Sequence, residues 1–360
     1  MIYKNDKKTK NNIYNLLVVL SYSETLGFFN SKWEFNFGEA PNSIDKLTYI
    51  TFKIFENYLA LGGRNLNIKN FFASDDTILN FATIHSIIND NPHSGFLHYK
   101  KDILDEKKVA GNTTIQSLEF ISKNLNKNTK YSDNAGGNGA AIRTASIGIL
   151  FDNIDHIIKQ SFLNSIVTHN NAIGFLGGIS TALITYFAYN KKSPDVWLEE
   201  LIKLESKIEK IVKENSDETE FKFYLKDKDK FWNKIKDYNE FKVKIYFNQK
   251  RTYEYYDRIE YLLKLFRPNY KNSRNLNIGG GAHEAIIIAY EAILLAFNSK
   301  IKNIDFDLLT FYGILHAGDN DSTGAICGAW YAAYQQNIPD NIHPNDLEYI
   351  NEINKIVDSI

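Results

Sequence analysis

The sequence predicts an all-α fold. Only 6 prolines occur among 360 residues, so long stretches lack the residue that most strongly interrupts helices. Within those stretches apolar residues recur at helical spacing, as in segments 78–88 and 286–297. Strand-like alternation is scarce. The run 241–247 alternates weakly inside a charged helical region, and we expect helix there as well.

Composition is that of a folded protein without a dominant charge. The hydrophobic fraction is 44%, and 42 basic residues balance 43 acidic ones to a formal net charge of -1. Such a balance does not favour a nucleic acid or an anionic membrane surface as partner. The single cysteine, Cys327, excludes an intrachain disulfide and fits a reducing compartment. We therefore expect a cytoplasmic protein.

Two apolar segments bear on membrane association. The run 16–20 is too short for the core of a secretory signal. The uncharged segment 172–189 is long enough to cross a bilayer, but it is rich in glycine, serine and threonine. We expect it to be a helix buried among other helices, with no membrane partner.

A charged helical segment extends over about residues 194–275, where lysine and glutamate alternate with aromatic residues. It could be an insertion. Amphipathic surface helices explain this composition better than a nucleic-acid-binding patch does, because acidic residues dilute the positive charge. The uncharged motifs occur on both sides of the segment, and so we expect residues 1–360 to form a single domain.

Two short acidic clusters, 74–77 and 319–323, each precede an apolar helix. Either cluster alone could simply cap its helix. Both helices are predicted to be buried, however, and no lysine or arginine lies beside either cluster in the sequence. Buried carboxylates are costly unless they are paired or bind a metal.

A divalent cation would compensate these carboxylates. Ligands made only of carboxylate and hydroxyl oxygen favour Mg²⁺, with Mn²⁺ as the alternative. Asp75, Asp76, Asp319 and Asp321 could hold two ions around a water nucleophile, which points to hydrolysis. His283 and His316 are weighed as ligands, but a lone histidine near a glycine turn is more often a hydrogen-bonded structural group.

Two glycine-containing loops precede predicted helices. The loop 133–143 contains Gly136, Gly137 and Gly139, and the loop 111–114 contains two threonines. Backbone N–H groups at such positions can bind phosphate. The spacing matches neither a Walker loop nor a dinucleotide fingerprint, and tight helix packing explains the glycines equally well.

Taken together and in order, these segments resemble the ADP-ribosylglycohydrolase family, and in particular its ADP-ribosylarginine hydrolase branch. The resemblance implies a compact orthogonal helical bundle with a two-magnesium site, and it extends over nearly the whole chain. The motifs that carry it are 26–35, 74–77, 136–143, 168–170 with 174–177, 281–285 and 318–323.

The resemblance also implies roles for individual residues. Glu34 would gate the site and assist acid–base chemistry beside the scissile bond, together with Asp75 and Asp76 as catalytic residues. The implied metal ligands are Ser74, Asp75, Asp76, Asp319, Asp321 and Ser322. The implied ADP-ribose pocket comprises Gly111, Thr113, Asn138, Gly139, His169 and His283.

The activity implied by the resemblance is hydrolysis of the N-glycosidic bond of mono-ADP-ribosylated arginine in proteins, with release of ADP-ribose, by a monomer. The alternatives are a hydrolase of serine-linked ADP-ribose or O-acetyl-ADP-ribose, and an inactive ADP-ribose-binding protein. The segment with Trp33 and Glu34 favours arginine, and the intact carboxylates weigh against the inactive protein.

Three positions depart from the pattern of the family. Glu24 stands where the family usually has aspartate, Ala172 where proline is usual, and Glu284 where aspartate is usual. The longer reach of Glu284 puts substrate preference in doubt more than it does metal binding.

Overall fold

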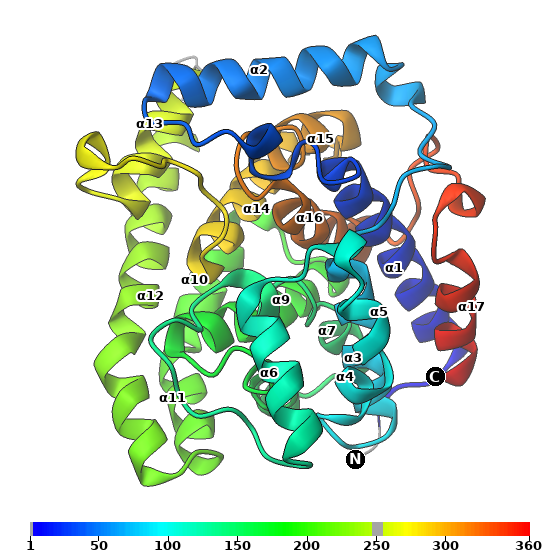
Figure 1. Cartoon of the computed structure of the whole chain (residues 1–360), viewed down its shortest axis with the longest axis vertical. Coiled ribbons are helices and arrows are strands. Elements are labelled where there is room, and N and C mark those ends of the chain that lie inside the picture. The colour runs from blue at the N-terminus through cyan, green and yellow to red at the C-terminus, as the bar shows by residue number, and fades with distance from the viewer. Residues whose placement is uncertain (1–2, 247–254) are drawn as a thin grey trace.

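The computed structural model describes residues 3–246 and 255–360, and it confirms the all-α prediction (Figure 1). Within the described residues the strands are β1 (Phe297–Asn298) and β2 (Asn303–Ile304). They pair antiparallel, with Phe297 opposite Ile304. All remaining regular structure in these ranges is helical.

The first part of the chain contributes the central helix α1 (Lys7–Phe28), which is capped by the Asp6 carboxylate. This helix ends at Phe28, and the C-cap residue Phe29 adopts the left-handed conformation with φ 44°. Helix α2 crosses the top of the molecule, whereas α3 to α6 lie below it (Figure 1). These helices are α2 (Ile44–Ala60), α3 (Asp75–Ile88), α4 (Ser94–His98), α5 (Lys100–Ile103) and α6 (Asn112–Lys123).

Helix α9 (Ala172–Tyr189) has the bounds of the uncharged segment singled out in the sequence. Of the helices that the structure describes, it is the one long and apolar enough to cross a membrane, and 83% of that stretch is buried inside the protein. It packs against α7 (Ile147–Leu150), α8 (Ile154–Ser165) and helices of the later chain. As expected, it is a core helix.

The charged segment is mostly helical in its described part, and α12 includes residues 241–246, as expected. Residue 247 lies outside the described residues. Four aromatic side chains of the long helix α12 are buried: Tyr224, Phe231, Trp232 and Tyr238. The lysines and glutamates between them form a solvated face. The helices are α10 (Trp197–Lys203), α11 (Glu205–Glu214), α12 (Glu218–Tyr246) and α13 (Tyr255–Phe266).

The last part of the chain supplies α14 (Ala282–Ala296), α15 (Phe306–Gly313), α16 (Asn320–Gln335) and α17 (Ile350–Ser359). Helix α16 packs along α1, and α17 covers the other side of α1 (Figure 1). Short 3-10 helices are η1 (Glu34–Gly38), η2 (Gly63–Asn65), η3 (Glu106–Lys108), η4 (Asn138–Ala140), η5 (Pro194–Val196), η6 (Tyr270–Asn272) and η7 (Pro344–Asp346).

The close packing of α1 and α16 requires a glycine. A Cβ atom on Gly27 would lie 2.8 Å from the carbonyl oxygen of Asn320 and from the backbone nitrogen of Asp321. Backbone atoms cannot yield as a flexible side chain can, so only glycine admits this approach. The contact places the start of α16 beside the end of α1, next to the segment that carries Glu34.

Candidate functional site

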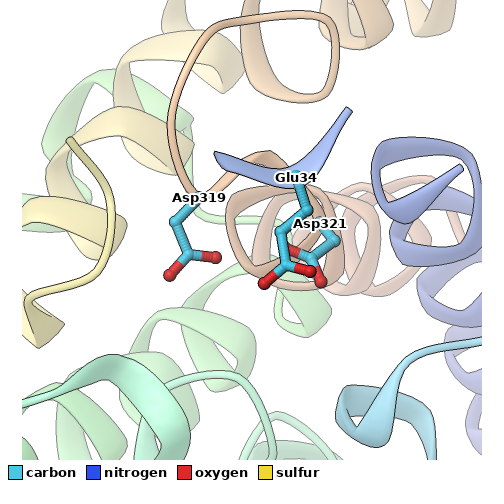
Figure 2. Close-up of side chains that lie close together, drawn as sticks. All are labelled: Glu34, Asp319 and Asp321. Atoms are coloured by element: carbon cyan, nitrogen blue, oxygen red, sulfur yellow. The ribbon is translucent and has the colours of Figure 1, made fainter. Parts of the chain in front are cut away.

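Three carboxylates from two distant segments meet at the start of α16. Glu34 begins η1, Asp319 precedes α16, and Asp321 lies in its first turn. One oxygen of each lies within 4.8 Å of an oxygen of the other two. Figure 2 shows the three side chains directed into the same space. Such a group could hold a metal ion.

The other acidic cluster lies at the start of α3. The Ser74 hydroxyl accepts a hydrogen bond from the Asp76 N–H at 3.2 Å and caps the helix. The Ser322 hydroxyl donates to the Asp76 carboxylate at 3.1 Å. The two clusters, which are 246 residues apart at this contact, therefore meet in space. All six residues expected to bind metal belong to these two helix starts.

Burial and mutual repulsion disfavour the charged form of these acids. Burial raises the pKa of Asp75, and the nearby charges of Glu24 and Asp319 raise it further. The pKa of Asp76 and that of Asp321 are raised well above the usual range by burial and by neighbouring carboxylates. Like charges confined in a poorly solvated site destabilise one another unless a cation intervenes.

The protein supplies little positive charge to this group. The Arg143 charge lowers the pKa of Asp75, but its guanidinium donates to the backbone carbonyls of Gly139, Asn164 and Ser165 rather than to a carboxylate. Asp319 Oδ1 is buried and has no hydrogen-bond partner. Ion pairs with at least one buried partner elsewhere in the described residues involve other acids, among them Glu291, Glu284 and Glu348.

Asn138 connects the first glycine loop to the acidic group. Its side-chain N–H₂ donates to the Gly279 carbonyl at 2.9 Å and to Asp319 Oδ2 at 3.0 Å. Gly139 lies against His169, because a Cβ atom on Gly139 would be 2.5 Å from its Cε1. The structure thus brings Asn138, Gly139 and His169 together beside Asp319. Burial lowers the pKa of His169 to about 3, so its ring is neutral.

Gly111 and Thr113 lie at the start of α6. This helix is joined to the segment before His169, since the Ser117 hydroxyl donates to the Thr168 carbonyl at 3.0 Å. None of the contacts of the described residues joins Gly111 or Thr113 themselves to the acidic group. Their role in binding ADP-ribose stays a prediction.

The two histidines weighed as ligands differ. Both ring nitrogens of His316 are hydrogen-bonded, to the Ala317 carbonyl at 2.8 Å and to the Thr323 hydroxyl at 2.7 Å. This is the structural arrangement expected for a lone histidine. His283 instead lies edge-on to the Phe266 ring, and its buried Nδ1 has no partner.

The three departures from the family pattern have distinct surroundings. Glu24 is fully buried and accepts from the Ser74 N–H and the Thr77 hydroxyl. The Ala172 N–H donates to the Tyr131 hydroxyl at 3.0 Å, a bond that proline could not make. Glu284 accepts from the Gly279 N–H at 2.9 Å and lies 3.4 Å from Arg267, so its carboxylate supports the glycine segment 279–281.

Nothing in the sequence indicates a role for Lys108 and Glu348, whose side chains contact the backbone of Ala73. Their side chains form an ion pair at 2.7 Å across 240 residues. Neither lies in a motif, and no local spacing signals the contact. Only the three-dimensional arrangement of the chain identifies them.

The fold and the site define an all-helical protein with a central group of buried carboxylates. The chain belongs to the ADP-ribosylglycohydrolase family, whose model matches residues 25–360. It is therefore a hydrolase of a family that acts on ADP-ribosylated substrates and releases ADP-ribose.

Individual relatives agree with this membership. ADP-ribosylhydrolase ARH1 of Dictyostelium discoideum is 29% identical over 94% of this chain and 91% of its own length. L444 of Acanthamoeba polyphaga mimivirus, assigned to the ADP-ribosyl glycohydrolases, is 29% identical over 95% of this chain and 68% of its own. A solved ADP-ribosylglycohydrolase-related protein complex shares the fold, with a TM-score of 0.56, 13% identity and 98% coverage of both chains.

Proposed function

We propose that this hydrolase cleaves the N-glycosidic bond between ADP-ribose and an arginine side chain of a modified protein, with two Mg²⁺ ions in its site. The ions would be held by Ser74, Asp75, Asp76, Asp319, Asp321 and Ser322. The observation that carries the proposal is the meeting of two acidic helix starts in a buried site to which the described residues supply little positive charge.

The donor set fits divalent cations of this kind. It consists of carboxylate and hydroxyl oxygens, which are the ligands that Mg²⁺ prefers, with Mn²⁺ as the nearest substitute. The unpartnered Asp319 Oδ1 is a free acceptor inside the group. When bound, such cations neutralise charge on oxygen and lower the pKa of water.

The residues of the chain hold this arrangement in place. The Asn138 amide fixes one oxygen of Asp319, and the Ser322 hydroxyl fixes one oxygen of Asp76. Side chains that are held before the substrate binds need little reorganisation during the reaction.

Glu34 is the half-buried member of the group, and its side chain lies beside that of Asp321 (Figure 2). The Phe35 N–H donates to the Gly318 carbonyl at 2.9 Å, which ties the segment to the loop before Asp319. Trp33 is fully buried and stacks on Phe29. Burial and neighbouring carboxylates raise the pKa of Glu34, so it can hold the proton that a departing guanidine nitrogen needs.

The arginine linkage rests on two considerations. The motif 26–35 resembles the arginine-specific branch of the family. A guanidinium is also a cation, and the group around Glu34 is rich in carboxylates that would attract it. We further propose that the protein is a cytoplasmic monomer, with a buried Cys327 thiol whose pKa burial raises to about 12.

The test is to follow the release of free ADP-ribose from three substrates: arginine-linked peptide, serine-linked peptide and O-acetyl-ADP-ribose. Each is incubated with Mg²⁺ and then with a chelator. We expect release from the arginine-linked peptide only, and loss of release with the chelator. Preferential release from either other substrate would replace the arginine assignment, and full activity in chelator would remove the metal assignment. Binding of ADP-ribose without any turnover would identify an inactive reader.

A further inference from the structure

The segment 72–74, which leads into α3, is held by side chains from three distant parts of the chain. Its three consecutive N–H groups donate to Asn30 Oδ1 at 2.6 Å, to Glu348 Oε2 at 2.8 Å and to Glu24 Oε2 at 3.1 Å, in that order. These acceptors lie 42, 275 and 50 residues away in the sequence. We refer to them, with Lys108, as the clamp.

Lys108 completes the clamp by binding a backbone carbonyl of the same segment, whereas the other members accept from its N–H groups. Its ammonium donates to the Ala73 carbonyl at 3.0 Å and pairs with Glu348 Oε2 at 2.7 Å. The Lys108 side chain is only 3% exposed, and its Nζ also lies 4.8 Å from the Tyr349 ring centre. A buried ammonium is tolerated because both partners are present, and removing one leaves a costly unpaired charge.

Helix capping does not account for this arrangement. The capping acceptor of α3 is the Ser74 hydroxyl, which receives the Asp76 N–H. The clamp instead takes N–H groups that precede the helix, and an isolated helix would form without them. Its side chains therefore fix where α3 begins relative to the rest of the protein, rather than whether α3 forms.

The position of this helix start matters because the two acidic clusters come from different helices. Asp75 and Asp76 directly follow the clamped segment, whereas Asp319 and Asp321 belong to α16. A site shared by two helices keeps its geometry only if both helix starts are fixed. The Ser322 contact to Asp76 is the one direct hydrogen bond between the clusters among the described residues.

We infer that Glu24 and the Lys108/Glu348 ion pair are positioning residues that set the cation affinity of the site. This inference rests on the proposed two-cation site. It assigns a function to the segment after α16, because Glu348 holds Ala73 and thereby Ser74. None of the three residues needs to touch substrate or the reacting atoms.

The test measures Mn²⁺ affinity by titration calorimetry on the full chain. We expect Glu348→Ala to weaken Mn²⁺ binding about tenfold, the lower end of losses seen on removing groups that orient metal ligands. Glu348→Gln keeps an acceptor for the Ala73 N–H, and we expect a loss of about threefold from it. The matched control is Asp152→Asn, which breaks the exposed Lys4/Asp152 ion pair, also between distant segments and also at 2.7 Å. We expect it to stay within about twofold of the unmodified protein.

Hydrogen exchange of the amides of residues 72–74 in metal-free protein is the second measurement. Faster exchange in Glu348→Gln, with α3 otherwise still protected, supports the clamp and holds even if Glu348→Ala fails to fold. Unchanged exchange and unchanged Mn²⁺ affinity in Glu348→Gln and Lys108→Met overturn the clamp but leave the proposed function standing. Absence of Mn²⁺ binding by the unmodified protein overturns both.

Discussion

The starts of α3 and α16 both carry acidic residues of the candidate site, but different kinds of contact hold them in position. The start of α3 is held by distant side chains, namely Glu24, Glu348 and Asn30. The start of α16 depends more on backbone: the Asp319 N–H donates to the Ile278 carbonyl at 2.9 Å, and Asp319 makes no side-chain cap hydrogen bond, although the Asn138 amide donates to its carboxylate. Side-chain contacts can be removed one at a time. The backbone packing at Gly27, in contrast, is disturbed in full by any added side chain. We therefore expect graded responses at α3 and abrupt ones at α16.

The largest effect is expected where the two starts meet. Asp75→Asn and Asp321→Asn each remove a charge that would bind the cations, and we expect turnover to fall at least about a hundredfold. In chelator the same variants should melt at a higher temperature than the unmodified protein, because one buried repelling charge is gone. Rate assays check the loss of turnover, and melting curves in chelator check the gain in melting temperature. Near-normal rates would remove these residues from the site.

The glycine contact of α16 is the next to test. Gly27→Ala puts a methyl group 2.8 Å from the backbone of residues 320 and 321. We expect a loss of about 1–3 kcal/mol in the free energy of unfolding, typical of overpacking, together with weaker Mn²⁺ binding. Denaturant unfolding measures the first effect, and Glu56→Ala on the exposed face of α2 is the control. Full stability and full affinity in Gly27→Ala would show that the approach of the two helices can relax.

The pH dependence of protein stability tests whether the buried carboxyl groups of both helix starts repel one another. The pKa values of Asp75 and Glu24 are raised to about 7, chiefly by burial. A carboxyl group with a raised pKa in the folded state favours folding at low pH, and its contribution is lost as pH rises through the folded value. In chelator we expect the melting temperature to fall between about pH 5 and 8, and to fall less in saturating Mg²⁺. A rise over that window in chelator would contradict the charge assignment.

The smallest effect is expected at the outermost member of the clamp. Asn30 accepts the Phe72 N–H at an exposed position, and its backbone is left-handed with φ 55°. Asn30→Gly removes the acceptor without adding backbone strain. We expect Mn²⁺ affinity to change by less than about threefold, against about tenfold for Glu348→Ala. An equal loss in both variants would mean that the clamp does not act in graded steps.

The sequence predicts the helical elements and the acidic clusters well, because both have local signals. Helical spacing predicts the segment 78–88, which α3 contains, and a cluster such as Ser74 to Thr77 is visible within a few residues. The meeting of the clusters followed from the cost of burying carboxylates. Glu34 was identified only through resemblance, since a lone glutamate before a polar turn has no pattern of its own.

The clamp could not be predicted, because its members share no spacing. Lys108 and Glu348 are ordinary charged residues in the sequence, and their pairing depends on how α17 and α5 flank α3. The glycines of loop 133–143 were equally open to two explanations. The structure supports the packing explanation for Gly139, which lies against His169.

The hydrogen bond between the Ala73 N–H and Glu348 joins residues that are 275 positions apart in the sequence. A ribosome makes residue 73 long before residue 348, so through most of translation the start of α3 lacks the hydrogen bond from the Ala73 N–H to Glu348. Asp319 and Asp321 are also made late, so the two acidic clusters cannot meet before then. The order of synthesis thus delays a cation-competent centre until nearly the whole sequence described here has been made.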